Sequence, residues 1–150
     1  ECEGNIGCAY NKFMELLPNN DDWGCFLDHD AMFTTHDWYN QLNDIIRKHP
    51  KVGAFGARTN RLNSTYQLVG NIDVYNHDVK YHRRIGKHLQ KTYYDKLFEV
   101  DDNTEQAGFS SVLILIKKAV WKKILVWFWD LQYSNALADD ESMLKKLRTP

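Results

Sequence analysis

Residues 23–35 read WGCFLDHDAMFTT, and the prediction of the fold starts from this stretch. An apolar run over residues 23–27 ends in two carboxylates, Asp28 and Asp30. Short apolar runs rich in aromatic residues are typical of buried strands. Charged groups are costly to bury unless they are paired or bind a metal, and strand ends in open α/β sheets face the ligand crevice. We therefore expect Asp28 and Asp30 where a buried strand opens into a cleft.

The two carboxylates predict a metal site. Carboxylate oxygens are hard ligands that suit Mg²⁺ or Mn²⁺, and substrate phosphates usually complete the coordination shell. A plainer interpretation stays open beside it, because an Asp-x-Asp sequence after a strand is often only a turn or the N-cap of the next helix.

Apolar residues recur at helical spacing on both sides of this strand in the sequence. It predicts a helix over residues 5–17, with Asn5 as its N-cap, and a second helix over residues 34–49. Thr34 and Asp37 resemble a capping box at the start of the second helix. A short buried strand over residues 52–57 then follows.

The alternation of helices and strands predicts an α/β fold. A βαβ order is typical of a parallel sheet covered by helices, so we expect a Rossmann-like, mostly parallel sheet within a single domain over residues 1–150. The second half continues the alternation. Strands are predicted over 66–69, 97–100 and 111–116, and helices over 78–93, 117–124 and 139–147. The cationic face of the helix over 78–93 is either a solvated surface or a patch near phosphates or an acceptor.

The composition limits the classes of partner and the cellular compartment that we expect. The formal net charge of -1 favours no nucleic acid partner. Three cysteines form no CxxC pair, so we expect free thiols in a reducing, cytoplasmic compartment, although Cys2 and Cys8 could still pair. The apolar runs are too short to span a membrane. Peripheral membrane contact through the basic and aromatic residues 117–129 stays open.

Four segments together resemble a known enzyme family, the GT-A-fold, family 2-like glycosyltransferases. Residues 4–11, GNIGCAYN, are similar to the family's Asn- and Gly-containing segment before the central strand. Residues 26–30, FLDHD, resemble its hydrophobic-Leu-Asp-x-Asp metal motif. Residues 108–111, GFSS, with the strand and basic helix that follow, resemble its glycine–strand–helix unit, and residues 139–147 resemble its catalytic-base helix.

The resemblance implies an inverting transfer of a sugar from a nucleotide-sugar donor, with UDP or GDP as the leaving group. It implies that Asp30 coordinates Mn²⁺ or Mg²⁺ and that Asp28 binds the metal through water or holds the ribose. Asp140 would be the catalytic base, with Asp139 as the second candidate. Gly108 would let the backbone approach the donor or acceptor closely. The acceptor could be a glycan, a lipid-linked molecule or a protein.

The sequence also departs from the family. Asp139-Asp140 stands where the family has Glu-Asp, and Ser142 and Lys146 stand at its second acid and its Arg. Because the sequence begins at Glu1, we expect a domain truncated before the strand and helix that hold the nucleotide base and ribose. A non-catalytic module that binds a sugar or a partner is therefore the alternative function. A metal-dependent nuclease or phosphatase is a third hypothesis, and an open sheet edge would permit a homo-oligomer.

Overall fold

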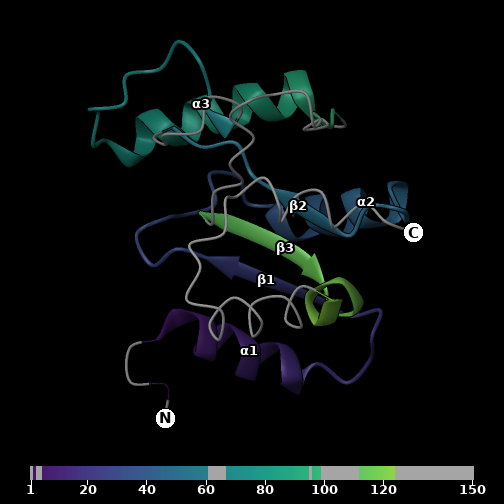
Figure 1. Ribbon diagram of the computed structural model, residues 1–150. Coiled ribbons are helices and arrows are strands. Elements are labelled where there is room, and N and C mark those ends of the chain that lie inside the picture. Colours follow the sequence, from purple (N-terminus) through teal and green to yellow (C-terminus); the bar gives the residue numbers. More distant parts are fainter. Residues whose placement is uncertain (1, 3–4, 61–66, 95, 99–111, 124–150) are drawn as a thin grey trace, which may run out of the picture. The chain divides into compact units, whose positions relative to one another are not determined.

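The computed structural model describes residues 2, 5–60, 67–94, 96–98 and 112–123 (Figure 1). Residues 118–123 are helical. In the described part of the chain, no helix is long and apolar enough to cross a membrane. The other helices and strands are, in chain order, α1 (Ile6–Leu16), β1 (Trp23–Leu27), α2 (Trp38–Lys48), β2 (Ala54–Gly56), α3 (Val79–Tyr93) and β3 (Leu113–Lys117).

The three strands form an antiparallel sheet in the order β1-β3-β2. The backbone amide of Asp28 donates to the carbonyl of Val112 over 3.0 Å, and the amide of Lys118 donates to the carbonyl of Asp22 over 2.8 Å. Residue numbers therefore fall along β3 as they rise along β1, and the two arrows point in opposite directions in Figure 1. The predicted GT-A-like, mostly parallel sheet is wrong.

The physical reason is the position of β3. Alternating helices and strands predict neighbouring parallel strands only when each new strand pairs with the one before it. Here β3, which comes last in the described chain, pairs with both β1 and β2 and separates them. Of the predicted strand over 66–69, the described residues 67–69 form only an isolated bridge, between Thr59 and Leu68.

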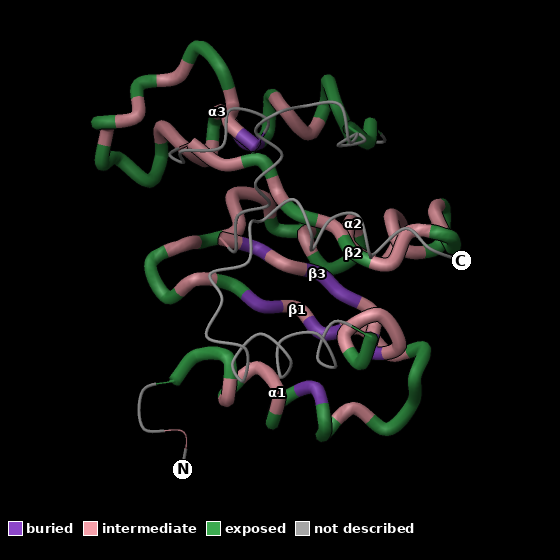
Figure 2. Tube along the Cα trace, in the orientation of Figure 1, coloured by how far each residue is buried: buried purple, intermediate pink, exposed green. Residues whose placement is uncertain are grey.

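Contacts divide the chain into two compact units, Glu1–Cys25 with Leu115–Pro150, and Phe26–Ile114. Strands β1 and β3 contribute residues to both units. Figure 2 shows that buried positions are concentrated in these two strands.

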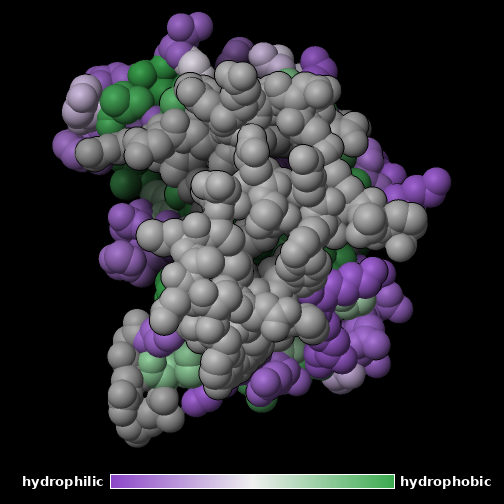
Figure 3. All heavy atoms as spheres, in the orientation of Figure 1, coloured by the Kyte–Doolittle hydropathy of each residue, from purple (hydrophilic) through white to green (hydrophobic). Residues whose placement is uncertain are grey.

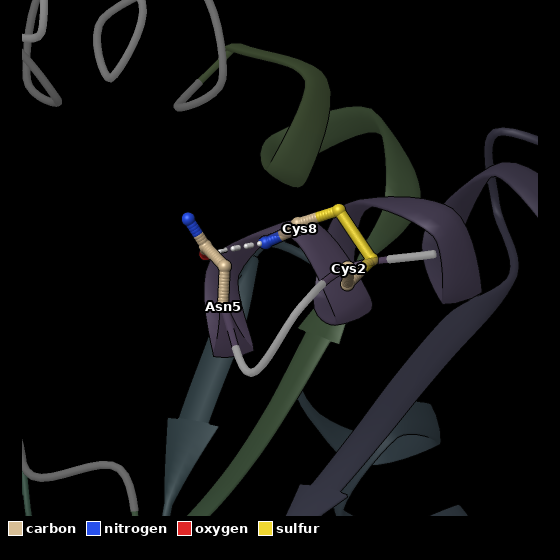
Figure 4. Close-up of a disulfide and its surroundings, with 3 residues drawn as sticks. All are labelled: Cys2, Asn5 and Cys8. Carbon is tan, nitrogen blue, oxygen red and sulfur yellow. Dashed lines mark hydrogen bonds between the residues drawn. A yellow bond between two sulfur atoms is a disulfide. The ribbon is translucent and has the colours of Figure 1, made fainter.

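In the first unit, α1 begins as predicted. The side chain of Asn5 accepts a hydrogen bond from the amide of Cys8 over 3.0 Å, which satisfies one of the free donors at the helix N-terminus. A disulfide joins Cys2 to Cys8 around this cap (Figure 4). The expectation of free thiols is therefore wrong for these two cysteines, because the chain before α1 brings their Cα atoms to 5.6 Å, a separation that a disulfide can bridge. Cys25 is free and half-buried, and burial raises the pKa of its thiol above the ordinary value.

The opposite end of α1 is held by a buried lysine. Lys118 is only 9% exposed, and its Nζ donates to the carbonyl oxygens of Leu17 and, over 3.5 Å, of Glu15. The last carbonyls of a helix lack partners within the helix and carry partial negative charge, so a cation is favourable there. Met14, 1% exposed, packs in the same unit against Gly24 of β1.

The turn between α1 and β1 is bound to the helical residues 118–123. Ala119 donates its amide to the carbonyl of Asn20 over 3.0 Å, and Lys122 Nζ donates to the Asn20 side chain over 2.8 Å. Lys117 forms an ion pair of 2.6 Å with Asp21. Lys117 and Lys122, two lysines of the stretch that suggested membrane contact, thus bind this chain's own turn.

In the second unit, α3 follows the prediction closely, with Asp78 as its N-cap accepting a hydrogen bond from the amide of Lys80 over 2.9 Å. Helix α2 begins at Trp38, four residues later than predicted, and its N-cap residue is Asp37. The predicted capping box at Thr34 is therefore wrong, and the contacts that replace it belong to the site described next.

Candidate functional site

The candidate site is the turn that follows β1. The amide of Asp28 donates to the carbonyl of Val112, the residue before β3, and the amide of Ala31 donates back to the Asp28 carbonyl over 3.0 Å. The strand therefore ends at Leu27, and Asp28 and Asp30 lie within one turn directly after it. This confirms the predicted position of the two carboxylates at the end of a strand.

Both carboxylates are accessible to a ligand. Asp28 is half-buried, and Asp30 is exposed, as is His29 between them. Within the described residues, neither carboxylate accepts a hydrogen bond or joins an ion pair. The oxygens of both carboxylates are therefore available to a bound cation or a hydrogen-bond donor.

The described residues contain no group of three or more His, Cys, Asp or Glu side chains that could hold a metal ion. Asp28 and Asp30 can therefore offer a cation two carboxylates and no further ligand from these residue types in the described chain. This donor set fits Mg²⁺ or Mn²⁺, since such sites commonly use one or two carboxylates with substrate phosphates and water.

The segment after the turn is packed against α3. The segment also contacts the start of α2. There, Phe33 stacks on Trp38 with ring centroids 4.2 Å apart and planes 8° from parallel. Thr34 lies directly against Gly86, the one buried residue of α3. Because a side chain at position 86 would overlap Thr34, glycine allows this close approach. The chain that leaves the carboxylate turn thus packs closely against α3 at Thr34.

Polar contacts extend this packing over the following residues. Arg83 donates to His36 Nε2, and Gln90 donates to both carboxylate oxygens of Asp37 over 2.9 and 2.8 Å. Gln41 also donates to Asp37 over 2.8 Å. The carboxylate of Asp37 accepts hydrogen bonds from these two side chains, and it makes no side-chain cap bond to α2. This tertiary use of Asp37 explains why local capping rules failed here.

A further contact joins α2 to Tyr94, the residue that follows α3. The hydroxyl of Tyr94 donates to Asp44 over 2.9 Å, and Arg47 pairs with Asp44 over 2.5 Å. The hydrogen bond from Tyr94 is the main cause that lowers the pKa of Asp44, and Arg47 and Lys48 add to it. The same bond raises the pKa of Tyr94 above its ordinary value. The lowered pKa of Asp44 and the raised pKa of Tyr94 both mean that the hydrogen-bonded pair is stabilised at neutral pH.

The other predicted site residues, Gly108, Asp139 and Asp140, lie outside the described residues. The structure therefore brings together Asp28 and Asp30 and leaves the predicted base and glycine as predictions. The side chain of His82 on α3 binds the carbonyl of Asn76 through Nε2 over 2.6 Å. That nitrogen is used within the fold.

Sequence reasoning missed the residues that support the turn, namely Gly86, Arg83 and Gln90 of α3. They lie some 50 residues away from their partners, as the separations of 47 and 53 residues for Arg83 and Gln90 show. The one available signal was Gly86 itself, because glycine inside a helical pattern is unfavourable and often marks a close packing contact.

Comparisons with known proteins add no relative. A scan against protein-family models found no match, and searches of curated proteins and of solved structures found no significant match.

Proposed function

We propose that the chain takes part in metal-dependent transfer of a sugar from a nucleotide-sugar donor to an acceptor hydroxyl. The observation that carries the proposal is the pair Asp28 and Asp30, accessible and without a partner in the described residues, directly after β1. The resemblance of residues 26–30 to the metal motif of family 2-like glycosyltransferases supports it. The proposal depends on this turn and not on a parallel sheet.

In the proposed mechanism, Asp30 holds the divalent cation, and Asp28 either binds it through water or orients the ribose. Mn²⁺ or Mg²⁺, when bound, would offset the charge that develops on the departing nucleoside diphosphate. Asp140, with Asp139 as the second candidate, would accept the proton of the attacking hydroxyl, as the sequence predicts. Gly108 would allow close approach of the backbone to the donor or acceptor.

The contacts with α3 have a defined role in this proposal. Thr34 on Gly86 and Asp37 on Gln90 hold the chain a few residues after the carboxylates. When the reacting groups are held in place before the substrate arrives, less freedom is lost on the way to the transition state. The activation barrier of the reaction is therefore lower. These α3 residues are positioning residues, since none of them is expected to touch the donor.

For the compartment, we propose an oxidising one in place of the predicted cytoplasm. The Cys2–Cys8 disulfide supports this, because disulfides persist in oxidising environments and are rare where thiols are kept reduced. Thiol counting on protein purified without reductant tests it. One reactive thiol, that of Cys25, is expected, and three would contradict it.

The test of function is a calorimetric titration of UDP and then GDP, each with and without Mn²⁺. We expect binding of at least one nucleotide that requires the metal and is lost in Asp30→Asn. Glu15→Gln on α1, which is also exposed and changes the charge equally, should bind like the wild type. If Asp30→Asn binds the metal–nucleotide complex as tightly as the wild type, the proposed role of the turn is refuted.

Where binding is found, turnover separates the two functions that the sequence left open. A screen of sugar donors on that nucleotide should show acceptor-dependent release of nucleoside diphosphate, and Asp30→Asn should lower its rate by orders of magnitude. Metal-dependent binding without any turnover would instead support the non-catalytic sugar-binding module.

A further inference from the structure

The Cys2–Cys8 disulfide lies at the surface, at the N-terminal end of α1. Both cysteines are half-buried, and residues 5–7 between them are exposed. In the view of Figure 3, side chains of described residues are visible at the lower edge, where Figure 1 draws α1. Disulfides that solvent reaches are reduced more readily than buried ones, and they include the regulatory and catalytic bridges. A dissolved thiol can therefore meet this bridge.

The two sulfur atoms of the bridge have different electrostatic surroundings. Cys8 is the third residue of α1, whereas Cys2 precedes the helix. Side chains of a helix lean toward its N-terminus, where the partial positive charge of the backbone amides stabilises an anion. The first turn of α1 contains no acidic residue, and the exposed Lys12 lies one turn after Cys8 on the same side of the helix. Glu1 and Glu3 flank Cys2 in the sequence and disfavour a further negative charge there. A thiolate is therefore more favourable on Cys8 than on Cys2.

Two hydrogen bonds support the same segment without using either sulfur atom. The amide of Asn5 donates to the carbonyl of Cys2 over 2.7 Å, and the side chain of Asn5 accepts from the amide of Cys8 over 3.0 Å (Figure 4). The second of these bonds is the N-cap of α1. Because the cap does not depend on the disulfide, the bridge can open while α1 keeps its first turn.

We propose that Cys2 and Cys8 form a thiol-exchange site on the folded chain, at which a low-molecular-weight thiol becomes bonded to Cys2 while Cys8 leaves as the thiolate. A sulfur atom leaves faster when its thiolate is more stable, and this gives the exchange its direction. The third cysteine, Cys25, is half-buried, and burial raises the pKa of its thiol, which makes it a poor competitor at neutral pH. The inference does not rest on the proposed enzymatic activity.

The exchange takes place in two steps. The thiolate of one thiol molecule, which has lost its proton to water, bonds to the Sγ of Cys2, and the Cys2–Cys8 bond breaks with its electron pair on the Sγ of Cys8. A second thiolate then displaces Cys2 from the mixed disulfide. In total, two thiol molecules are oxidised to one disulfide, and the bridge is reduced to two cysteine thiols that take up the two protons. The mixed disulfide at Cys2 is the modified form of the chain.

The test is reduction of the wild-type chain at neutral pH by 2-mercaptoethanol, a thiol with no other charged group. Samples are quenched early with N-ethylmaleimide, and tandem mass spectrometry of the peptide that contains both cysteines locates the bound thiol. We expect the mixed disulfide on Cys2 to exceed that on Cys8 about fivefold, the factor by which a helix N-terminus favours a negative charge.

The kinetics show whether the folded chain itself reacts. The reduction rate is measured at urea concentrations below the unfolding transition. We expect it to rise in proportion to the thiol concentration and to stay constant over these urea concentrations, because the reaction needs no unfolding. A reaction that required unfolding would instead accelerate steeply with urea.

A matched pair of variants tests the electrostatic reason for the direction. Lys12 and Lys51 are both exposed, and replacing either by Gln removes one positive charge, but only Lys12 lies on α1. We expect Lys12→Gln to slow the reduction about twofold, as for charged side chains one turn apart on a helix. Lys51→Gln should react like the wild type.

Any one of three results overturns the inference. The first is a mixed disulfide found equally on both cysteines or mainly on Cys8. The second is a reduction rate that follows the unfolded fraction in urea, which would make the bridge purely structural. The third is an equal rate for Lys12→Gln and Lys51→Gln, which would refute the stabilisation of the Cys8 thiolate by its helix.

Discussion

Replacement of Gly86 by alanine tests whether α3 holds the segment that follows the carboxylate turn. A Cβ atom at this position would lie 2.5 Å from the Cβ of Thr34 and closer still to its hydroxyl oxygen. Real side chains do not approach this closely, so Thr34 or the helix must move. The contact is inside unit Phe26–Ile114, where Gly86 is the one buried residue of α3.

Two opposing effects decide whether Gly86→Ala raises or lowers the free energy of unfolding. Glycine inside a helix is less stable than alanine by about 0.5–1 kcal/mol, so an open site would gain that amount. Overpacking a filled site costs about 1–3 kcal/mol. The Cβ–Cβ overlap cannot be relieved by rotating the Thr34 side chain, because its Cβ is fixed by the backbone. We therefore expect a net destabilisation of about 1–2 kcal/mol, the cost of overpacking less the helical gain.

The assay is urea unfolding followed by circular dichroism, with a double-mutant cycle. Thr34→Gly removes the atoms that the new Cβ would meet, so Gly86→Ala should be neutral or stabilising in that background. If Gly86→Ala raises the free energy of unfolding by about 1 kcal/mol in the wild-type background, as in an open helix, the close packing of Thr34 on α3 is refuted.

Three further predictions concern other contacts. Lys118→Met should lower the free energy of unfolding by about 1–3 kcal/mol, measured by urea titration, because it leaves the carbonyls at the end of α1 without a donor. Tyr94→Phe should weaken the pH dependence of stability at both extremes. The lowered pKa of Asp44 gives stability that is present above its ordinary pKa and lost as pH falls through the folded value. The raised pKa of Tyr94 gives stability that is present below its ordinary pKa and lost as pH rises through the folded value. Reduction of the Cys2–Cys8 disulfide should lower the melting temperature, corresponding to about 2 kcal/mol for so short a loop in the chain-entropy account.

Each of these predictions has a control within the chain. Lys123→Met, at an exposed position of the same helical residues, should leave stability unchanged, and an equal loss would contradict the role given to Lys118. Acid and alkaline unfolding of Tyr94→Phe that match the wild type would contradict the Asp44 pair. A Cys25→Ser variant should show the same response to reductant as the wild type, because the thiol of Cys25 is free.

The parts of the fold that depend on local sequence were predictable. Asn5 caps α1 as expected, and the helix predicted over 78–93 forms with Asp78 as its cap, because each cap is formed by a side chain and a backbone amide two or three residues away. The end of β1 was predictable for a similar reason, since the apolar run stops at the first carboxylate. These features use contacts that lie within a few residues along the chain.

The parts that depend on distant residues were not predictable. Nothing in the run over 113–117 indicates that it lies between β1 and β2 or that it is antiparallel to β1. Lys118 is buried although it is charged, because its Nζ donates to the unpaired carbonyls at the end of α1. Asp37 looked like part of a capping box, but Gln90, 53 residues later, binds its carboxylate. In each case the deciding partner is far away in the sequence.

The central claim is that Asp28 and Asp30, at the end of β1, bind a divalent cation together with a nucleoside diphosphate. The most direct measurement is paramagnetic broadening of backbone amide signals when Mn²⁺ is added to the ¹⁵N-labelled chain in the presence of UDP or GDP. The account predicts that the amides of residues 28–31 broaden first and that Asp30→Asn abolishes this effect. Broadening centred on another group of residues, with 28–31 unaffected, would contradict it.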